Sequence, residues 1–278
     1  MLSKEEIQKI FKTPNMAILK SLGQNFLIDE TVLKNIITCS DLNKDGVVIE
    51  IGPGLGTLTE ELSKKCKKVI AIEKDNEFAQ MLEGKFENVE VINGDILQMN
   101  INELVHKYSQ NGKFKLVSNI PYYITSPIIK LFLENAIQPE VIVLLMQKEV
   151  AQRICEKPGK LSMIALGVQV YGEPEIVGFV KNTSFYPAPK VDSAILKIKN
   201  IKREFSDEYY QKLFRIMKIG FSSKRKKLLN NLSAGLQIEK KEAEKFLNQT
   251  EIDLKVRAQE LSIEQWEKLM EVYTTVET

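Results

Sequence analysis

The sequence predicts an α/β fold, in which a parallel, doubly wound sheet carries helices on both faces and a smaller helical domain follows. Two observations indicate this fold. In the first 200 residues, short β-rich runs alternate with stretches that place apolar residues at helical spacing. From Ser206 to Val272 the β-rich runs stop and helical spacing dominates. We therefore expect one domain over residues 1–202 and a helical C-terminal domain over residues 203–278.

Five β-rich runs define the expected parallel sheet. The first is bounded by the turn-prone Asn43–Gly46 and by Gly52, and the last, VIVLLM, is apolar throughout, which suits a strand buried on both faces. Two later runs are expected to form an antiparallel hairpin at one edge. The five runs are Val47–Ile51, Lys68–Glu73, Val89–Asn93, Lys115–Asn119 and Val141–Met146, and the two later ones are Glu175–Val180 and Ser193–Lys199.

The composition is ordinary for a globular protein, with 44% hydrophobic and 27% charged residues. The sequence contains no apolar run of about 18 residues, so no membrane-spanning helix and no membrane partner are expected. The N-terminal stretch MLSKEEIQKIFKTP has no apolar signal core, and its two glutamates argue against a transit peptide. A cytoplasmic location is the expectation that follows.

Cysteine and histidine are too few and too scattered for metal or nucleophilic chemistry. Cys39, Cys66 and Cys155 lie far apart without a CxxC pair, and His106 is the only histidine. Reduced thiols in a reducing compartment are expected. We predict neither a bound transition metal nor a Cys/His catalytic pair.

Positive charge is concentrated in one part of the chain. The net charge is +2, but residues 181–230 contain 13 Lys and Arg residues against four Asp and Glu residues, a local charge of +9. Phosphate contacts supply most of the non-specific affinity of proteins for nucleic acids, so this excess favours a polyanionic partner. A solvated helix face is the alternative explanation of the charge alone.

A glycine-rich loop follows the first predicted strand. It reads Glu50-Ile-Gly-Pro-Gly-Leu-Gly56, and glycines such as Gly52 and Gly54 let a ligand approach the backbone where a side chain would block it. Loops at the carboxyl ends of strands bind ligands in open α/β sheets. The spacing is GxGxG and not the GxGxxG of dinucleotide-binding folds, which argues against the first alternative function, a nicotinamide-dependent dehydrogenase.

Acidic residues end the next two predicted strands. Glu73, followed by Lys74, can accept hydrogen bonds from both hydroxyls of a ribose, a device that NAD enzymes and methyltransferases share. Asp95, followed by Ile96, can accept a hydrogen bond from an adenine amino group. Together they indicate a nucleoside ligand, although each acid alone is equally compatible with an exposed strand end or a turn.

The fourth predicted strand ends in Asn119-Ile-Pro-Tyr122. Pro121 fixes the turn and removes a backbone donor. The side-chain oxygen of Asn119 and the carbonyl of Ile120 can both accept hydrogen bonds from one amino group, and Tyr122 offers a flat face on which a base can stack. The four residues predict a receptor for an exocyclic amino group on an aromatic ring, whereas a plain Asn-Pro turn accounts for only part of the set.

With these motifs in this order, the sequence resembles the ribosomal RNA adenine N6 dimethyltransferases, specifically the KsgA type that acts on the 16S RNA of the small ribosomal subunit. The resemblance extends over nearly the whole chain and implies a Rossmann-like class I methyltransferase sheet with S-adenosylmethionine as cofactor. Three further segments carry it: Leu22–Leu27 like the family's N-terminal motif, Phe185–Ser193 like its later loop, and Gly220–Asn230 like the start of its basic C-terminal helix.

The resemblance assigns roles to individual residues. Asn25 and Leu27 would contact the cofactor from the N-terminal segment, while Tyr122 and Phe185 would sandwich the target adenine. The implied cofactor-binding residues are Asn25, Leu27, Gly52, Gly54, Glu73, Lys74, Asp95, Ile96 and Asn119. The implied catalytic residues are Asn119, Ile120, Pro121, Tyr122 and Phe185. The implied RNA-binding residues are Lys190, Lys224, Arg225, Lys226 and Lys227.

The implied reaction is methyl transfer from S-adenosylmethionine to N6 of two adjacent adenosines in a 16S rRNA loop, giving N6,N6-dimethyladenosine, with a role in 30S subunit biogenesis. Hydrogen bonds from N6 to the Asn119 oxygen and the Ile120 carbonyl would favour a pyramidal nitrogen and stabilise its developing positive charge. The target base must leave its stack to react. We expect a monomer whose partner is 16S rRNA in the 30S subunit or its precursor.

One residue departs from the pattern of this group, because Ile120 stands where leucine is frequent. Isoleucine also occurs there in the erythromycin-resistance methyltransferases, which modify 23S rRNA, so that activity remains an alternative. The length of the C-terminal region and the Phe185–Ser193 loop favour the small-subunit type. A non-catalytic ribosome-assembly factor that binds RNA is an alternative of another class, and the intact cofactor and adenine motifs argue against it.

Overall fold

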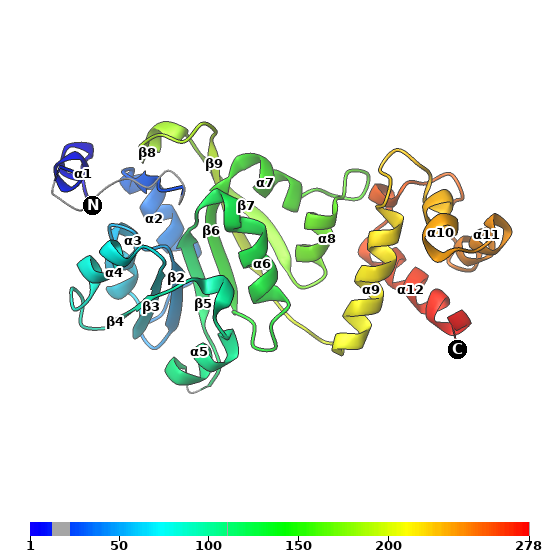
Figure 1. Ribbon diagram of the computed structural model, residues 1–278, viewed down its shortest axis with the longest axis horizontal. Helices are drawn as coiled ribbons and strands as arrows, with labels where there is room; N and C mark the ends of the chain where they lie inside the picture. The colour runs from blue at the N-terminus through cyan, green and yellow to red at the C-terminus, as the bar shows by residue number, and fades with distance from the viewer. Residues whose placement is uncertain (13–22, 110, 278) are drawn as a thin grey trace. The chain divides into compact units, whose positions relative to one another are not determined.

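The computed structural model describes residues 1–12, 23–109 and 111–277 (Figure 1). The chain divides into two units, and each is described by itself. The first unit contains residues 1–152 and 171–202, and the second contains residues 153–170 and 203–278. The sequence predicts a boundary after residue 202, which puts 153–170 in the first domain, whereas the structure places this segment in the second unit.

A seven-stranded sheet is the centre of the first unit (Figure 1). Its strand order is β4-β3-β2-β5-β6-β9-β7, and β2 pairs in parallel with both β3 and β5. The two pairs that involve β9 are antiparallel. The strands are β2 (Val47–Ile51), β3 (Lys68–Glu73), β4 (Val89–Asn93), β5 (Lys115–Asn119), β6 (Val141–Gln147), β7 (Glu173–Val180) and β9 (Ser193–Lys199). The predicted α/β fold is therefore confirmed.

The strand bounds follow the predicted runs closely. β2, β3, β4, β5 and β9 coincide with them, while β6 extends to Gln147 and β7 begins earlier, at Glu173. Pro174 lies in β7, which is an edge strand, and edge strands are where proline is ordinarily accommodated in a sheet. Consecutive buried residues along β2 and β6 show that both faces of the central strands are covered.

Two helices of the first unit begin where a short polar side chain caps them, and helices of this unit pack through apolar faces. Asp29 accepts hydrogen bonds from backbone N–H groups of α2, and Asp75 does the same for α4. Ile36 of α2 and Leu62 of α3 are fully buried in a core shared with Val69 of the sheet. The helices of this unit are α1 (Lys4–Ile10), α2 (Glu30–Cys39), α3 (Thr57–Ser63), α4 (Asn76–Leu82), α5 (Ile101–Tyr108) and α6 (Thr125–Leu133), and α7 (Lys148–Ile154) crosses the boundary between the units.

A short two-stranded sheet joins distant parts of the first unit. β1 (Phe26–Leu27) pairs antiparallel with β8 (Phe185–Tyr186), and the Ile28 N–H donates to the Ser184 carbonyl at 2.9 Å. This pairing brings the Leu22–Leu27 motif, of which Leu22 lies outside the described residues, against the Phe185–Ser193 loop.

The second unit is helical, as the sequence predicts for its C-terminal part. Its core surrounds Trp266, which is fully buried. Leu161, Ala165 and Leu166 belong to the same core, and this apolar contact explains why 153–170 packs with the C-terminal helices. The helices are α8 (Met163–Gln169), α9 (Asp207–Gly220), α10 (Leu228–Leu236), α11 (Lys240–Gln249) and α12 (Ile263–Glu277). Among all described residues, no helix is long and apolar enough to cross a membrane.

Candidate active site

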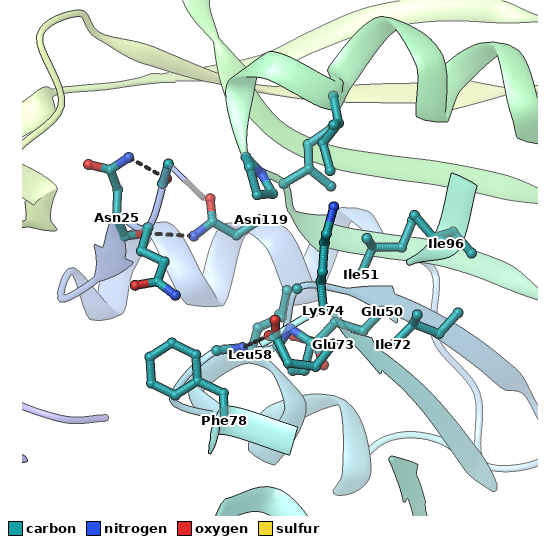
Figure 2. A pocket seen from close by; sticks show the side chains of 18 of the residues that line it. Asn25, Glu50, Ile51, Leu58, Ile72, Glu73, Lys74, Phe78, Ile96 and Asn119 are labelled. Carbon is teal, nitrogen blue, oxygen red and sulfur yellow. Dashed lines mark hydrogen bonds between the residues drawn. The ribbon is translucent and has the colours of Figure 1, made fainter. Parts of the chain in front are cut away.

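One pocket lies at the carboxyl ends of β2, β3, β4 and β5 (Figure 2). β2 is the strand at which the order of the sheet reverses, and ligands bind at such switch points in open α/β sheets. The pocket is also lined by the N-terminal segment from Gly23 to Leu27 and by the turn after β5. All the residues that the sequence assigns to the cofactor line it: Asn25, Leu27, Gly52, Gly54, Glu73, Lys74, Asp95, Ile96 and Asn119.

The glycine loop is tied to Glu73 by backbone hydrogen bonds. The Gly54 N–H donates to Glu73 Oε2 at 3.0 Å, and the Asp75 N–H donates to Glu73 Oε1 at 2.9 Å. Burial raises the pKa of Glu73, and these two hydrogen bonds partly offset that effect. The carboxylate is thus held in a fixed orientation at the end of β3, facing the pocket.

The last glycine of the loop, Gly56, has no room for a side chain. Its φ is +83°, and a Cβ there would lie 2.5 Å from Cδ2 of Leu82, which is 1% exposed. Gly56→Ala therefore combines a left-handed backbone with overpacking, and we expect it to lower the free energy of unfolding by about 2–4 kcal/mol. Thermal or urea unfolding of the free protein measures this loss.

Gly84→Ala is the matched control for Gly56→Ala. Gly84 has a φ of +68°, but a Cβ at that position would have no neighbouring atom within 4 Å. Gly84→Ala should therefore lower the free energy of unfolding only by the backbone strain, about 1–2 kcal/mol. Equal losses in the two variants would show that the contact with Leu82 contributes nothing.

Asp95 and Lys74 form an ion pair at the ends of β4 and β3, with 2.9 Å between Asp95 Oδ2 and Lys74 Nζ. The hydrogen bond with Lys74 lowers the pKa of Asp95, and its other oxygen accepts from the Leu97 N–H at 3.0 Å. Asp95 is therefore ionised near neutral pH and suited to accept a hydrogen bond from an amino group.

Asn119 lies in the pocket close to Asn25 and away from Glu73 (Figure 2). Its Nδ2 donates to the Asn25 carbonyl at 3.2 Å, and Asn25 Nδ2 donates to the Gly23 carbonyl at 2.8 Å. With Nδ2 engaged, Oδ1 of Asn119 makes no hydrogen bond within the described parts of the chain. This arrangement leaves an amide oxygen as an acceptor at the pocket.

The turn after β5 is anchored to its surroundings. The Ser118 hydroxyl donates to the Ile51 carbonyl, which joins the ends of β5 and β2. Ile120 is 2% exposed, and the short 3₁₀ turn Tyr122–Ile124 follows Pro121. A fixed turn of this kind holds the Asn119 amide and the Ile120 carbonyl in one place relative to the glycine loop.

Tyr122 is half-buried and joins the turn to the start of β9. Its hydroxyl lies 2.7 Å from Oγ of Ser193, which is fully buried. Burial raises the pKa of Tyr122, so the phenol is neutral at physiological pH. The hydrogen bond fixes the ring of Tyr122 and connects the turn with the last residue of the Phe185–Ser193 segment.

Phe185 is the one expected catalytic residue that the structure does not bring into the pocket. It is 3% exposed and packs in the core with Leu27 and Val180, because β8 pairs with β1 at this point. A stacking role for Phe185 stays a prediction, and it requires the side chain to leave this core position.

The expected RNA-binding residues are exposed. Lys190 belongs to the first unit and Lys224–Lys227 to the second. The family resemblance places the basic run at a helix start, and in the structure it forms the turn before α10, with Lys227 as the N-cap. The buried Asn231 holds this turn, since its Nδ2 donates to the carbonyls of Gly220 and of Ser223, the latter at 3.0 Å.

Several pocket residues were not predicted from the sequence. Glu50 belongs to the quoted glycine motif, but no role was assigned to it, and it lies buried at the pocket. Gln24 lines the pocket and donates to Asp75 at 3.0 Å, and the exposed Tyr123 lies at its edge. Outside the pocket, the role of Asn231 at the basic turn was not predicted either, because an asparagine inside a helical pattern is ordinarily an exposed residue.

The sheet order and the pocket at its switch point, together with the solved structures that superpose on this chain, identify the fold as that of the class I methyltransferases. The chain belongs to the ribosomal RNA adenine dimethylase family, whose model, "Ribosomal RNA adenine dimethylase", matches residues 15–275. It is 42% identical over 254 residues to the ribosomal RNA small subunit methyltransferase A of Dehalococcoides mccartyi strain BAV1, covering 90% of this chain and 86% of the relative. It is 38% identical to the protein of the same name from Clostridioides difficile, covering 98% and 95%.

Two solved structures support the assignment of the chain to this family. A dimethyladenosine transferase from Plasmodium falciparum superposes with a TM-score of 0.74 at 25% identity, covering 90% of this chain and 98% of the other. The 23S rRNA methyltransferase ErmE superposes with a TM-score of 0.71 at 27% identity, covering 89% and 99%.

Proposed function

We propose that this protein dimethylates N6 of two adjacent adenosines in 16S ribosomal RNA, with S-adenosylmethionine as methyl donor, during biogenesis of the 30S subunit. The observation that carries the proposal is the single pocket in which the glycine loop and the acids of β3 and β4 meet Asn119 and the turn up to Tyr122. Ribosomal RNA is the substrate class and S-adenosylmethionine the cofactor of this family.

The residues of the pocket fit this cofactor. Glu73 would hold the ribose hydroxyls and Asp95 the adenine amino group, with Ile96 against the ring and the Gly52–Gly54 backbone beside the methionine part. The carboxyl groups of Glu50 and Glu73 are both buried in the pocket, which suits a ligand of net positive charge. When bound, S-adenosylmethionine supplies a methyl group already activated on a positively charged sulfur.

Asn119, Ile120 and Tyr122 would act on the adenine. The Asn119 Oδ1 and the Ile120 carbonyl would accept hydrogen bonds from N6, which draws the nitrogen out of the ring plane and stabilises positive charge as it develops. Tyr122 would stack on the base and hold it for in-line attack. The chain needs no strong general base here, because the methylated N6 becomes acidic and loses its proton readily.

Replacing Tyr122 should separate base stacking from cofactor binding. Tyr122→Ala removes a stacking contribution of about 1–3 kcal/mol, so kcat/KM for RNA should fall by about 5- to 150-fold. The Kd for S-adenosylmethionine should change by less than about threefold, because Tyr122 would stack on the target adenine of the RNA and not on the cofactor. Methyl incorporation from labelled cofactor and calorimetric titration measure the two quantities.

Tyr122→Phe is the control for that experiment. It keeps the ring and loses only the hydrogen bond to Ser193, which contributes about 0.5–1.5 kcal/mol. We expect it to retain most of the activity. A Tyr122→Phe variant as inactive as Tyr122→Ala would assign the effect to the hydroxyl and would contradict the stacking role.

The partner of this activity would be 16S rRNA within the 30S subunit or its precursor, bound by a monomer in the cytoplasm. The high identity to small subunit methyltransferases over nearly the whole chain supports this target. The exposed Lys190 and Lys224–Lys227 would contact RNA phosphates.

Methylation of purified particles tests the proposed target. Undermethylated 30S and 50S subunits are incubated separately with the protein and labelled S-adenosylmethionine. We expect label in the 16S RNA of 30S particles and none in 50S particles. Label confined to 23S RNA would identify the resistance-type activity, and binding to 30S particles without any label would indicate an assembly factor that has lost catalysis.

A further inference from the structure

Glu50 has an unpaired carboxyl oxygen buried at the pocket. Its side chain lies at the end of β2, beside Glu73 (Figure 2), and the residue is 2% exposed. Within residues 1–12, 23–109 and 111–277, Glu50 Oε2 and the neighbouring Thr59 Oγ1 have no hydrogen-bond partner. Buried polar atoms are normally paired, so this orphaned oxygen points to a group that the free protein lacks.

The two buried carboxyl groups of the pocket differ in their partners. Both oxygens of Glu73 accept backbone N–H groups, which stabilises its charge. No backbone N–H of the described residues donates to Glu50 Oε2. Burial raises the pKa of Glu50 to about 8, the Thr59 hydroxyl, which lies close but outside hydrogen-bonding geometry, lowers it in part, and the charge of Glu73 raises it further. Of two like charges buried together, the one without hydrogen bonds is the one that keeps its proton.

Within the described part of the pocket, no positive charge from the surrounding elements compensates Glu50. Thr59 comes from α3 and is neutral, and Glu73 at the end of β3 carries the same charge. Lys74, the one lysine among the described pocket residues, is paired with Asp95. A cation that neutralises Glu50 must therefore come with the ligand.

On the basis of the proposed function, we propose that the Glu50 carboxyl carries a proton in the free protein and releases it to solvent when the positively charged cofactor enters the pocket. Glu50 would then be a positioning residue whose charge forms only in the complex. The exchange is balanced, because one proton leaves as one net positive charge binds.

The consequence is a cofactor affinity that depends on pH. With the pKa of Glu50 at about 8, binding at pH 7 should release about 0.9 protons, and binding at pH 9 about 0.1. The association constant should therefore rise by nearly tenfold per pH unit up to about pH 7 and level off above about pH 8.

Calorimetric titration of the RNA-free protein with S-adenosylmethionine tests this coupling. Titrations at pH 7 in phosphate and in Tris, whose ionisation enthalpies differ, give the number of protons released. We expect about 0.9 for the unaltered protein and nearly none for Glu50→Gln, whose affinity should also be nearly independent of pH. Asp95→Asn is the control: it should weaken binding but leave proton release intact, because Asp95 is already ionised.

The outcomes separate this inference from the proposed function. Absence of any binding by the unaltered protein would overturn both. Binding without proton release, or release that persists in Glu50→Gln and disappears in Glu73→Gln, would overturn the role of Glu50 alone.

Unfolding of the free protein gives a second readout that does not need the cofactor. A carboxyl group whose pKa is raised in the folded state lowers the free energy of unfolding as pH rises. For Glu50 this decrease runs from its unfolded pKa of about 4.5 to its folded pKa of about 8. The melting temperature of the unaltered protein should therefore decline relative to that of Glu50→Gln as pH rises across this range. Identical slopes in two folded proteins would contradict a protonated Glu50.

Discussion

Asn119→Ala is expected to abolish most methyl transfer while leaving part of the cofactor binding intact. The substitution removes Oδ1, which makes no hydrogen bond within the described residues and is therefore available to N6 of the target adenine. Loss of one preorganised group that stabilises charge in a transition state costs about 10²- to 10³-fold in kcat. Single-turnover methylation of 30S particles with labelled cofactor measures the loss.

The accompanying cofactor measurement makes this result specific. Asn119 also donates to the Asn25 carbonyl, so its removal loosens the N-terminal segment and weakens cofactor binding to some extent. Assays at saturating S-adenosylmethionine remove that contribution. Full activity of Asn119→Ala under these conditions would exclude Asn119 from the chemical step.

Removing the four positive charges before α10 is expected to have the largest effect on RNA binding. The combined change of Lys224, Arg225, Lys226 and Lys227 to glutamine takes away exposed cations without disturbing the buried Asn231 that holds the turn. If each cation neutralises one phosphate, the slope of log K against log salt should decrease in magnitude by about 3. Titration of 16S RNA at two or more salt concentrations measures the slope.

A four-lysine variant of the same helical unit serves as the control. Glutamines at Lys240, Lys241, Lys245 and Lys268 remove the same number of exposed charges from α11 and α12. They should change the salt slope by much less. A similar effect of both variants would indicate that overall charge governs binding, and an unchanged slope in the first variant would remove the basic turn from the RNA interface.

The sequence predicts the sheet and the pocket because both depend on local patterns. Apolar strands end in glycine, acid or Asn-Pro motifs, and the carboxyl ends of neighbouring parallel strands meet at one edge of the sheet. Glu73, Asp95 and Asn119 therefore line one pocket although they are distant in sequence.

Features that depend on packing between distant parts of the chain could not be predicted from the sequence. Phe185 lies in the core because β8 pairs with β1, a contact between residues far apart in the chain. Leu161 and Leu166 join the helical core around Trp266 for the same reason, which shifts 153–170 to the second unit. The orphaned oxygen of Glu50 is invisible in a sequence, because it depends on which neighbours fail to reach it.

The central claim is that this pocket directs methyl groups to the exocyclic nitrogen of adenine. Nucleoside mass spectrometry of 16S RNA from methylated 30S particles tests it most directly. We predict N6,N6-dimethyladenosine at two adjacent positions, and none after treatment with Asn119→Ala. Methyl groups on a ring nitrogen, on ribose or on another base would contradict it.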